Sequence, residues 1–207
     1  MSGLAFAVAA TLRHDGNGSV ADLLATPAQA AAWVEQHHEL VTDVLGRPLE
    51  GADDARDELL RIRRAIRTLF ARAVAPAPPS KADAHLLMDA DGALRMVNRA
   101  ADRLGTLQLD WPDDGVPVTR WAGRTVDPVA LLVGAVGRST IDFLSGPDLP
   151  RLRACPAARC VRYFLQDDPR QTWCSPSCGN RERVNRHYRR RHGAPSQSES
   201  DPGGARD

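Results

Sequence analysis

The sequence predicts a mostly α-helical N-terminal domain with a short β hairpin, followed by a small cysteine-rich module with a β hairpin and a helix. Three observations predict this fold class: helical apolar periodicity over 1–145, a turn-rich segment at 146–150, and four cysteines confined to 155–178. The chain has 207 residues, 43% hydrophobic and 26% charged, which is typical of globular proteins and excludes a wholly disordered chain.

Composition shifts divide the chain into four segments. We expect an N-terminal domain over 1–145, a linker over 146–150, the cysteine-rich module over 151–192 and a disordered tail over 193–207. The tail is expected to be disordered because Ser, Gly, Pro and acidic residues dominate it.

The apolar segment at the start of the chain is too short to cross a membrane. The run over 4–12 is the longest candidate, whereas a spanning helix needs about 18 residues or more. No basic segment precedes it, so we do not expect a signal peptide. The sequence therefore predicts a cytoplasmic protein without a membrane partner.

The next two helices have recognisable signals. Thr26 followed by Pro27 is typical of a helix start, and this helix should run to about His38. His37 and His38 point different ways on a helix, so we interpret them as surface or interface residues rather than metal ligands.

A second helix is expected over 53–74, because apolar residues recur there at three- and four-residue steps and form one stripe. Acidic residues lie at its start and arginines near its end, an order that suits the helix dipole. We interpret four of its arginines as a solvated face rather than a phosphate site: Arg61, Arg63, Arg64 and Arg67.

A proline-rich break over 76–80 separates that helix from the rest of the domain. A helical region should follow to about Leu104, interrupted near 89–92. Residues 107–121 predict two short strands around a turn at 112–115. A buried apolar helix is expected from Pro128 to about Leu144.

Charge is distributed unevenly along the chain, although the formal total is only +1. The first 150 residues carry a net −5, whereas residues 151–192 hold 11 arginines against three acidic residues, a net +8. A compact basic module predicts an anionic partner, nucleic acid first. The alternative is that the acidic and basic parts complement each other.

The cysteines form two close pairs, with four residues inside the first, thirteen between the pairs and three inside the second. Such pairs suit a tetrahedral Zn²⁺ ion, and four thiolates leave no open position, so the ion would be structural. An iron–sulfur cluster and free thiols are the alternatives. The predicted ligands are Cys155, Cys160, Cys174 and Cys178.

The module is too small to fold on an apolar core alone. Alternating apolar residues over 161–165 predict a strand, 167–170 a turn, 171–173 the returning strand, and Pro176 the first turn of a helix. A treble-clef-like zinc finger with four cysteine ligands is the economical interpretation.

A helical projection of the last segment separates two faces. Val184 and Tyr188 fall toward the zinc and the hairpin. Arg181 falls on that side too, and we expect it, with Asn180, to support the fold around the metal. The opposite face predicts nucleic-acid contacts from a basic set: Arg183, Arg186, His187 and Arg190.

Several short motifs now stand together: Cys155-Pro-Ala-Ala-Arg-Cys160, Tyr163-Phe164, Trp173-Cys174-Ser175 and Cys178-Gly179-Asn180-Arg181. This module resembles the CGNR zinc-finger family of bacterial proteins, which takes its name from the last tetrapeptide. The family's turn after the aromatic pair departs from its usual form here, with one residue inserted or shifted and its serine absent.

The first 145 residues resemble the ABATE domain that usually precedes this finger, on weaker features: the apolar start, Asp22-Leu23-Leu24 with Thr26-Pro27 and Trp33, the helix over 59–72 rich in Leu and Arg, and Val97-Asn98. The resemblance implies a stress-related transcriptional regulator whose first domain senses a signal, such as an unidentified small ligand, or mediates contacts.

Two function classes follow. In the first, the finger binds DNA, and the N-terminal domain forms a homodimer, because single modules bury only about 600–1,000 Å² on DNA. In the second, the chain is a zinc-stabilised protein-interaction module. An enzyme is not expected, since the sequence shows no nucleophile–base pair, phosphate loop or open metal site.

Overall fold

The computed structural model describes residues 3–14, 20–83, 86–123 and 125–191, so the predicted disordered tail lies outside the described residues. The described chain is mostly helical, with three two-stranded antiparallel hairpins, which confirms the predicted fold class. The elements in order are α1 (Leu4–Ala9), β1 (Leu12–His14), β2 (Val20–Asp22), α2 (Pro27–Gln36), α3 (His38–Leu45), α4 (Arg56–Val74), α5 (Ala90–Asp102), β3 (Thr106–Asp110), β4 (Val118–Ala122), α6 (Pro128–Leu144), the 3-10 turn η1 (Leu149–Arg151), β5 (Leu152–Ala154), β6 (Tyr163–Leu165) and α7 (Pro176–Arg191).

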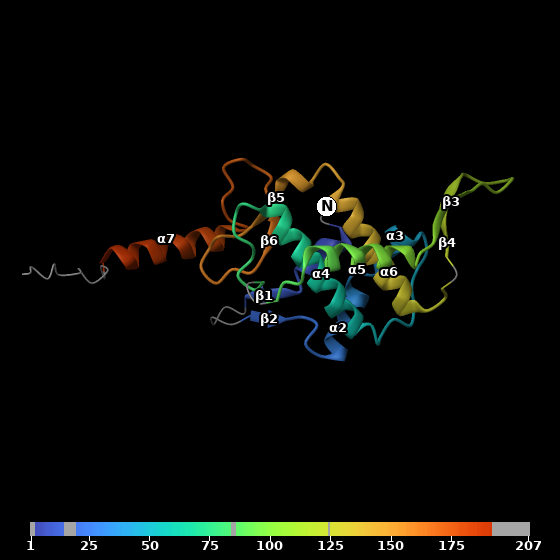
Figure 1. Ribbon diagram of the computed structural model, residues 1–207, viewed down its shortest axis with the longest axis horizontal. Helices are drawn as coiled ribbons and strands as arrows, with labels where there is room; N and C mark the ends of the chain where they lie inside the picture. The colour runs from blue at the N-terminus through green and yellow to red at the C-terminus, as the bar shows by residue number, and fades with distance from the viewer. Residues whose placement is uncertain (1–2, 15–19, 84–85, 124, 192–207) are drawn as a thin grey trace, which may run out of the picture.

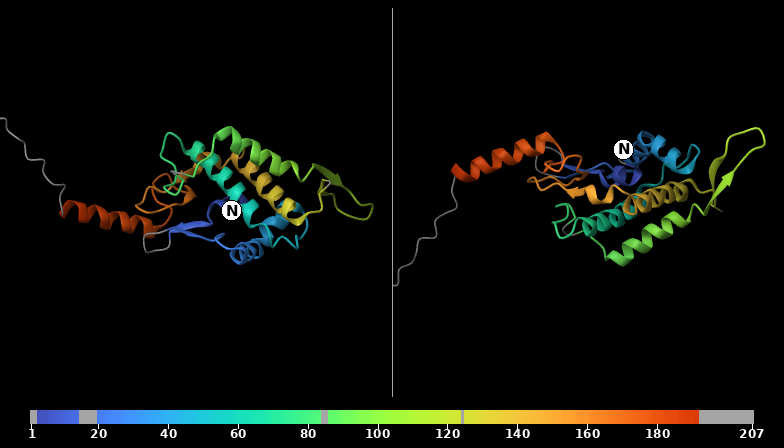
Figure 2. Two further views of the ribbon diagram at one scale, coloured as in Figure 1. Left: turned by 60° about the horizontal axis from the view of Figure 1, so that its bottom comes forward. Right: turned by 90° about the horizontal axis from the view of Figure 1, so that it is seen from above.

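The helical body lies between two projections (Figure 1). Helix α7 extends from one end and the β3–β4 hairpin from the other, and both further views agree (Figure 2). No helix among the described residues is long and apolar enough to span a bilayer.

Helices α4 and α6 form the centre of the body. The predicted apolar stripe of α4 is buried, with Leu59, Ile62 and Ile66 at most 1% exposed. Phe70 of the same helix contacts the rings of Phe6 and Phe143, at centroid distances of 5.1 and 5.3 Å. Each such side chain contributes about 1.5–3 kcal/mol through burial, so this contact layer holds α1, α4 and α6 together.

The predicted start of α2 is confirmed by a capping box. The Thr26 hydroxyl accepts from the Gln29 N–H, and the Gln29 side chain accepts from the Thr26 N–H. The chain turns at His37, and a separate helix, α3, follows that the sequence analysis missed. His37 stacks on Trp33 and its Nδ1–H donates to the Trp33 carbonyl at 2.8 Å, which holds this bend.

One other local expectation needs correction, and one pair of strands was missed. The helix expected to begin after residue 80 begins only at α5, where the Asp89 carboxylate caps it by accepting from Gly92 N–H. Strands β1 and β2, which pair with Leu12 opposite Asp22, were not predicted. The strands are only three residues long, too short for an alternating pattern to reveal them.

The strand pairing within the finger also differs from the prediction. Strand β6 pairs with β5, before the first cysteine pair, rather than with the expected strand over 171–173. Pairing of the two flanks closes the loop that holds Cys155 and Cys160, and the Cys155 N–H donates to the Arg162 carbonyl. The segment over 171–173 is held by a side-chain hydrogen bond instead. Gln166 Nε2 donates to the Gln171 carbonyl at 2.9 Å.

Body and finger share one hydrophobic core. Leu152 of β5 and Tyr163 of β6 are 1% and 7% exposed and lie in the same cluster as Phe70. The Tyr163 ring meets the Phe70 ring edge to face at 5.4 Å. The expected linker leads through η1 directly into this core, and Leu149 packs against it.

Candidate metal centre and basic helix

The four cysteine sulfurs lie together at the start of α7, all within 4.8 Å of one another. Cys174 Sγ is 3.7 Å from Cys160 Sγ and 3.6 Å from Cys178 Sγ. A tetrahedral site with Zn–S bonds of about 2.3 Å requires sulfurs about 3.8 Å apart. The arrangement therefore fits Zn²⁺, and these cysteines form the site of one structural zinc ion.

Two local structures position the sulfurs. Cys155 and Cys160 bound a tight loop between β5 and β6, in which Arg159 adopts φ 63°, a left-handed conformation that turns the chain sharply. Cys174 precedes α7 and Cys178 lies in its first turn, where the Cys178 N–H donates to the Ser175 carbonyl. The second pair is thus fixed by the helix start.

Crowding of the thiols makes the site dependent on a cation. Hydrogen bonds to Cys155 and Cys160, and then burial, raise the pKa of the Cys174 thiol well above its ordinary value. A hydrogen bond to Cys155 likewise raises the pKa of Cys160, to about 11. Four thiolates cannot coexist at this distance without a positive charge, so zinc binding must displace the protons and stabilise the loop.

Gly179 of the tetrapeptide has a steric role that the sequence analysis missed. A Cβ at this position would lie 3.2 Å from Cε3 of Trp173, closer than ordinary van der Waals contact. The indole therefore packs directly on the helix backbone beside the zinc ligands. Phe164 and Ala157 complete a small buried cluster around the sulfurs.

The three residues after Gly179 differ in whether their side chains contact the zinc loop or face solvent. Arg181 is half-buried and donates from Nη1 to the Ala158 carbonyl at 3.2 Å, and the Glu182 carboxylate accepts from the Ala158 N–H. These two contacts tie α7 to the zinc loop. Asn180 is exposed, and its Oδ1 accepts from Arg183 Nη1 at 2.8 Å on the same helix.

The predicted basic face lies in solvent. Helix α7 projects beyond the finger, so the acidic body does not cover it (Figures 1 and 2). The side chains proposed for nucleic acid are all exposed: Arg183, Arg186, His187 and Arg190.

The expectation that Val184 and Tyr188 face the zinc is wrong, since they are 67% and 63% exposed. The finger covers only the first turns of a 16-residue helix, which is about 24 Å long.

Comparison with models of known families shows to which family this chain belongs. A family model, ABATE, described as "Putative stress-induced transcription regulator", matches residues 3–147, and the CGNR zinc finger model matches residues 151–191. The chain belongs to the ABATE family. Its C-terminal module is a CGNR zinc finger, as the sequence analysis inferred from the cysteine motifs. No curated protein matches the sequence significantly.

The ABATE domain and the CGNR finger are joined by a buried polar network centred on Arg67, which is 3% exposed. Its guanidinium pairs with Asp83 at 2.5 Å and donates to the Ala9 carbonyl, the Ser80 hydroxyl and the Val161 carbonyl. Val161 belongs to the finger, so one buried arginine of the ABATE domain bonds to both modules.

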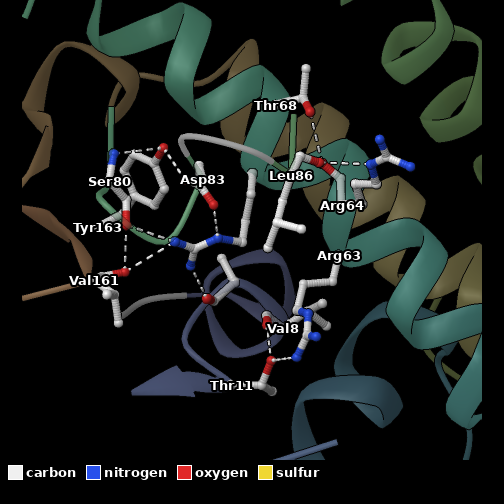
Figure 3. A network of polar contacts seen from close by, with 12 residues as sticks. Val8, Thr11, Arg63, Arg64, Thr68, Ser80, Asp83, Leu86, Val161 and Tyr163 are labelled. Carbon is white, nitrogen blue, oxygen red and sulfur yellow. Dashed lines mark hydrogen bonds and ion pairs between the residues drawn. The ribbon is translucent and has the colours of Figure 1, made fainter. Parts of the chain in front are cut away.

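Tyr163 and Ser80 complete this network (Figure 3). The Tyr163 hydroxyl donates to Asp83 Oδ2 at 2.7 Å, and the Ser80 hydroxyl donates to the Val161 carbonyl at 2.8 Å. Burial, and then the charge of Asp83, raise the pKa of Tyr163, so the phenol stays protonated and remains a donor. At the rim, Lys81 Nζ donates to the carbonyls of Pro156 and Ala157.

Arg63 is buried, as Arg67 is, so the interpretation of these two arginines as part of a solvated face is wrong. Its guanidinium binds both carboxylate oxygens of Asp22, at 2.6 and 2.7 Å, and donates to Thr11. Burial acts to raise the pKa of Asp22, but hydrogen bonds from Arg63 and the Leu24 N–H, with the nearby positive charges, outweigh it and lower that pKa. The β1–β2 hairpin therefore covers the side of α4 that carries Arg63, whereas Arg61 and Arg64 are exposed, as predicted for a solvated face.

Proposed function

We propose that this protein is a DNA-binding transcriptional regulator whose CGNR finger binds DNA through α7. The observation that carries the proposal is the exposure of the basic face on a helix that projects free of the body. The net charge of +8 on residues 151–192 supplies the attraction to phosphates. An α-helix of this kind fits the major groove of B-DNA.

The ABATE domain would receive a signal or a partner, and the whole chain would act in the cytoplasm as a binding protein rather than an enzyme. The description of the matched family supports the regulatory part. The Arg67 network supports the coupling, because any change at Asp83 reaches Val161 and Tyr163 of the finger.

Homodimerisation through the ABATE domain is a further part of the proposal. It would not use α6, whose Leu132, Ala135 and Val136 are fully buried in the core. It would use the β3–β4 hairpin, where Leu109 and Trp111 are each 67% exposed, and a second copy could cover this apolar surface. Light scattering on the purified protein, compared with a Trp111→Ser variant, tests it: a monomeric wild type contradicts this part.

The DNA-binding proposal is tested by fluorescence anisotropy with a labelled random-sequence duplex. The variant carries Arg183→Gln, Arg186→Gln and Arg190→Gln together. Each lost phosphate contact should reduce the slope of log affinity against log salt by about 0.9. The matched control replaces three exposed arginines of the body: Arg47, Arg72 and Arg95.

We expect the control to bind DNA like the wild type. Salt-sensitive DNA binding that is equal in both variants would show that the DNA interface does not lie on α7. Absence of DNA binding by the zinc-loaded wild type at micromolar concentration would contradict the proposal.

The second candidate function is a protein-interaction module, favoured by the exposure of Val184 and Tyr188 on the same helix. Apolar side chains contribute more to a protein interface than to phosphate contacts. A Val184→Ser, Tyr188→Ser variant separates the two: DNA affinity that survives this change favours DNA, whereas loss of a captured protein partner favours the alternative.

A further inference from the structure

A hollow of about 630 Å³ lies where the ABATE domain meets the CGNR finger. This volume falls in the range of small-molecule sites, which occur preferentially at domain interfaces. One wall comes from α1, β1 and α3 of the body, and the other from β6 and the segment up to the zinc ligand Cys174. A molecule bound here would contact both modules at once.

Two arginines in this hollow are available for an anion. Arg13 comes from the ABATE domain and Arg162 from the finger, and both are exposed. Within the described part of the chain, neither lies in an ion pair with a carboxylate. The carboxylates of the hollow, Asp148 and Asp167, are both paired with Arg151. With three arginines against two aspartates, the lining carries a net positive charge, and Arg13 and Arg162 are the arginines not engaged by these carboxylates.

The remaining lining includes apolar side chains. Phe6 and Phe164 are less than a tenth exposed and border the hollow from opposite modules, and half-buried Leu40 lines it too. The ring of His37 adds a flat surface, held by its stack on Trp33. These apolar side chains, together with two guanidiniums, suit a molecule with a hydrophobic body and one anionic group.

We propose that this hollow binds an organic carboxylate with an aromatic body, its carboxylate held between Arg13 and Arg162. A planar carboxylate matches the fork of N–H donors on a guanidinium, and charge-assisted hydrogen bonds of this type are among the strong ones. The aromatic body lies over Phe6, Leu40 and Phe164. Because the two arginines belong to different modules, the ligand adds to the contacts that already join the finger to the ABATE domain.

This inference deepens the proposed function, because it supplies the chemical class of the signal. The binding itself is measured without DNA, so the two can fail separately. The probes are benzoate, phenylacetate and naphthoate, with their neutral carboxamides and inorganic phosphate as comparisons. Ligand-observed NMR and calorimetry on the full-length zinc-loaded protein report binding.

We expect at least one carboxylate to bind saturably and its carboxamide to bind about tenfold more weakly, the loss of one charged contact. Arg13→Gln and Arg162→Gln should each weaken binding by about tenfold. Arg47→Gln, an exposed arginine outside the hollow, should leave it unchanged. Because the side chains of Arg13 and Arg162 are exposed, circular dichroism should show both variants folded.

Three results would overturn the assignment: no saturable carboxylate binding up to about 5 mM, equal binding of acid and amide, or wild-type affinity in both arginine variants. Displacement of the carboxylate by an equal concentration of inorganic phosphate would also overturn it, since it would show a general anion site. A carboxylate that binds but leaves DNA affinity unchanged would keep the site and refute only its regulatory use.

Discussion

The hydroxyl of Tyr163 donates to Oδ2 of Asp83 across the joint between the CGNR finger and the ABATE domain, at 2.7 Å. Asp83 is 1% exposed and its other oxygen accepts from Arg67. The ion pair of Arg67 and Asp83 lies within the ABATE domain, and Tyr163, 80 positions from Asp83, supplies the hydrogen bond to its second oxygen. The ABATE domain alone would leave this buried oxygen without that donor, so the finger contributes to the stability of the body.

Replacing Tyr163 with Phe should destabilise the whole chain. The change leaves the buried Asp83 oxygen without its O–H donor, which costs about 1–3 kcal/mol in the free energy of unfolding. Urea unfolding followed by circular dichroism measures it. The control is Tyr188→Phe, on a side chain that is 63% exposed, and it should change the free energy by less than about 0.5 kcal/mol. Equal effects of the two variants would contradict the role of the joint.

Zinc removal should loosen the finger without unfolding the core. The Cys174→Ser variant loses one of four ligands, and elemental analysis should show less than one zinc per chain where the wild type shows one. Tyr163 and Leu152 remain in the shared core, so most of the helical signal in circular dichroism should persist while α7 loses its anchor. The Ser177→Ala variant, on an exposed neighbour, is the control. Complete loss of helical signal on chelation would show instead that the core needs the metal.

Arg181 and Arg186 should differ in their effect on the finger. Arg181→Ala removes the bond to the Ala158 carbonyl and should lower the stability of the metal site by about 1 kcal/mol. Arg186→Ala changes a side chain on the exposed side of the helix and should stay within about 0.5 kcal/mol. Competition with a zinc chelator measures both. Indistinguishable zinc affinities of the two variants would contradict the role of Arg181 in stabilising the metal site.

The pair of Asp22 and Arg63 predicts a pH dependence. The pKa of Asp22 is lowered in the folded protein, so its stabilising effect is complete above the unfolded-state value of about 3.9 and is lost as the pH falls through the folded-state pKa. Asp22→Asn should therefore cost about 1.5–3 kcal/mol in the free energy of unfolding at pH 7, the range for a hydrogen bond to a charged group.

The difference from wild type should shrink as the pH falls below about 4 and through the lower folded-state pKa, because the folded wild type then also becomes uncharged at this position. Thermal unfolding across pH measures it, with Asp43→Asn on an exposed carboxylate as the control. A difference that is constant with pH would contradict the assigned ionisation.

The zinc ligands could be predicted because the spacing of the cysteines over 155–178 is itself typical of a zinc site. The capping box at Thr26 and the stripe through Leu59 and Ile66 were also local patterns. In each case the residues that define the feature lie within a few turns of one another. Short-range rules are sufficient for such features.

Arg63 and Arg67 could not be predicted as buried, because their partners lie elsewhere in the chain. Arg67 meets Asp83 and Val161, and the second of these is 94 positions away. A helix surface rich in arginine ordinarily faces water. Only the fold shows that the β1–β2 hairpin and the finger cover this one. The exposure of Val184 was missed because a helical projection shows which side chains share a face, but not how much of that face the rest of the protein covers.

Lys81 is the only lysine in the chain, and its Nζ donates to Pro156 and Ala157 at the rim of the zinc loop. Among the side chains, an amine-selective reagent therefore modifies only the joint between finger and body. The rate at which a small acylating reagent modifies this ε-amine reads out whether the finger is docked. Mass spectrometry of a single peptide can then follow docking, in the intact protein, as zinc, DNA or a carboxylate is added.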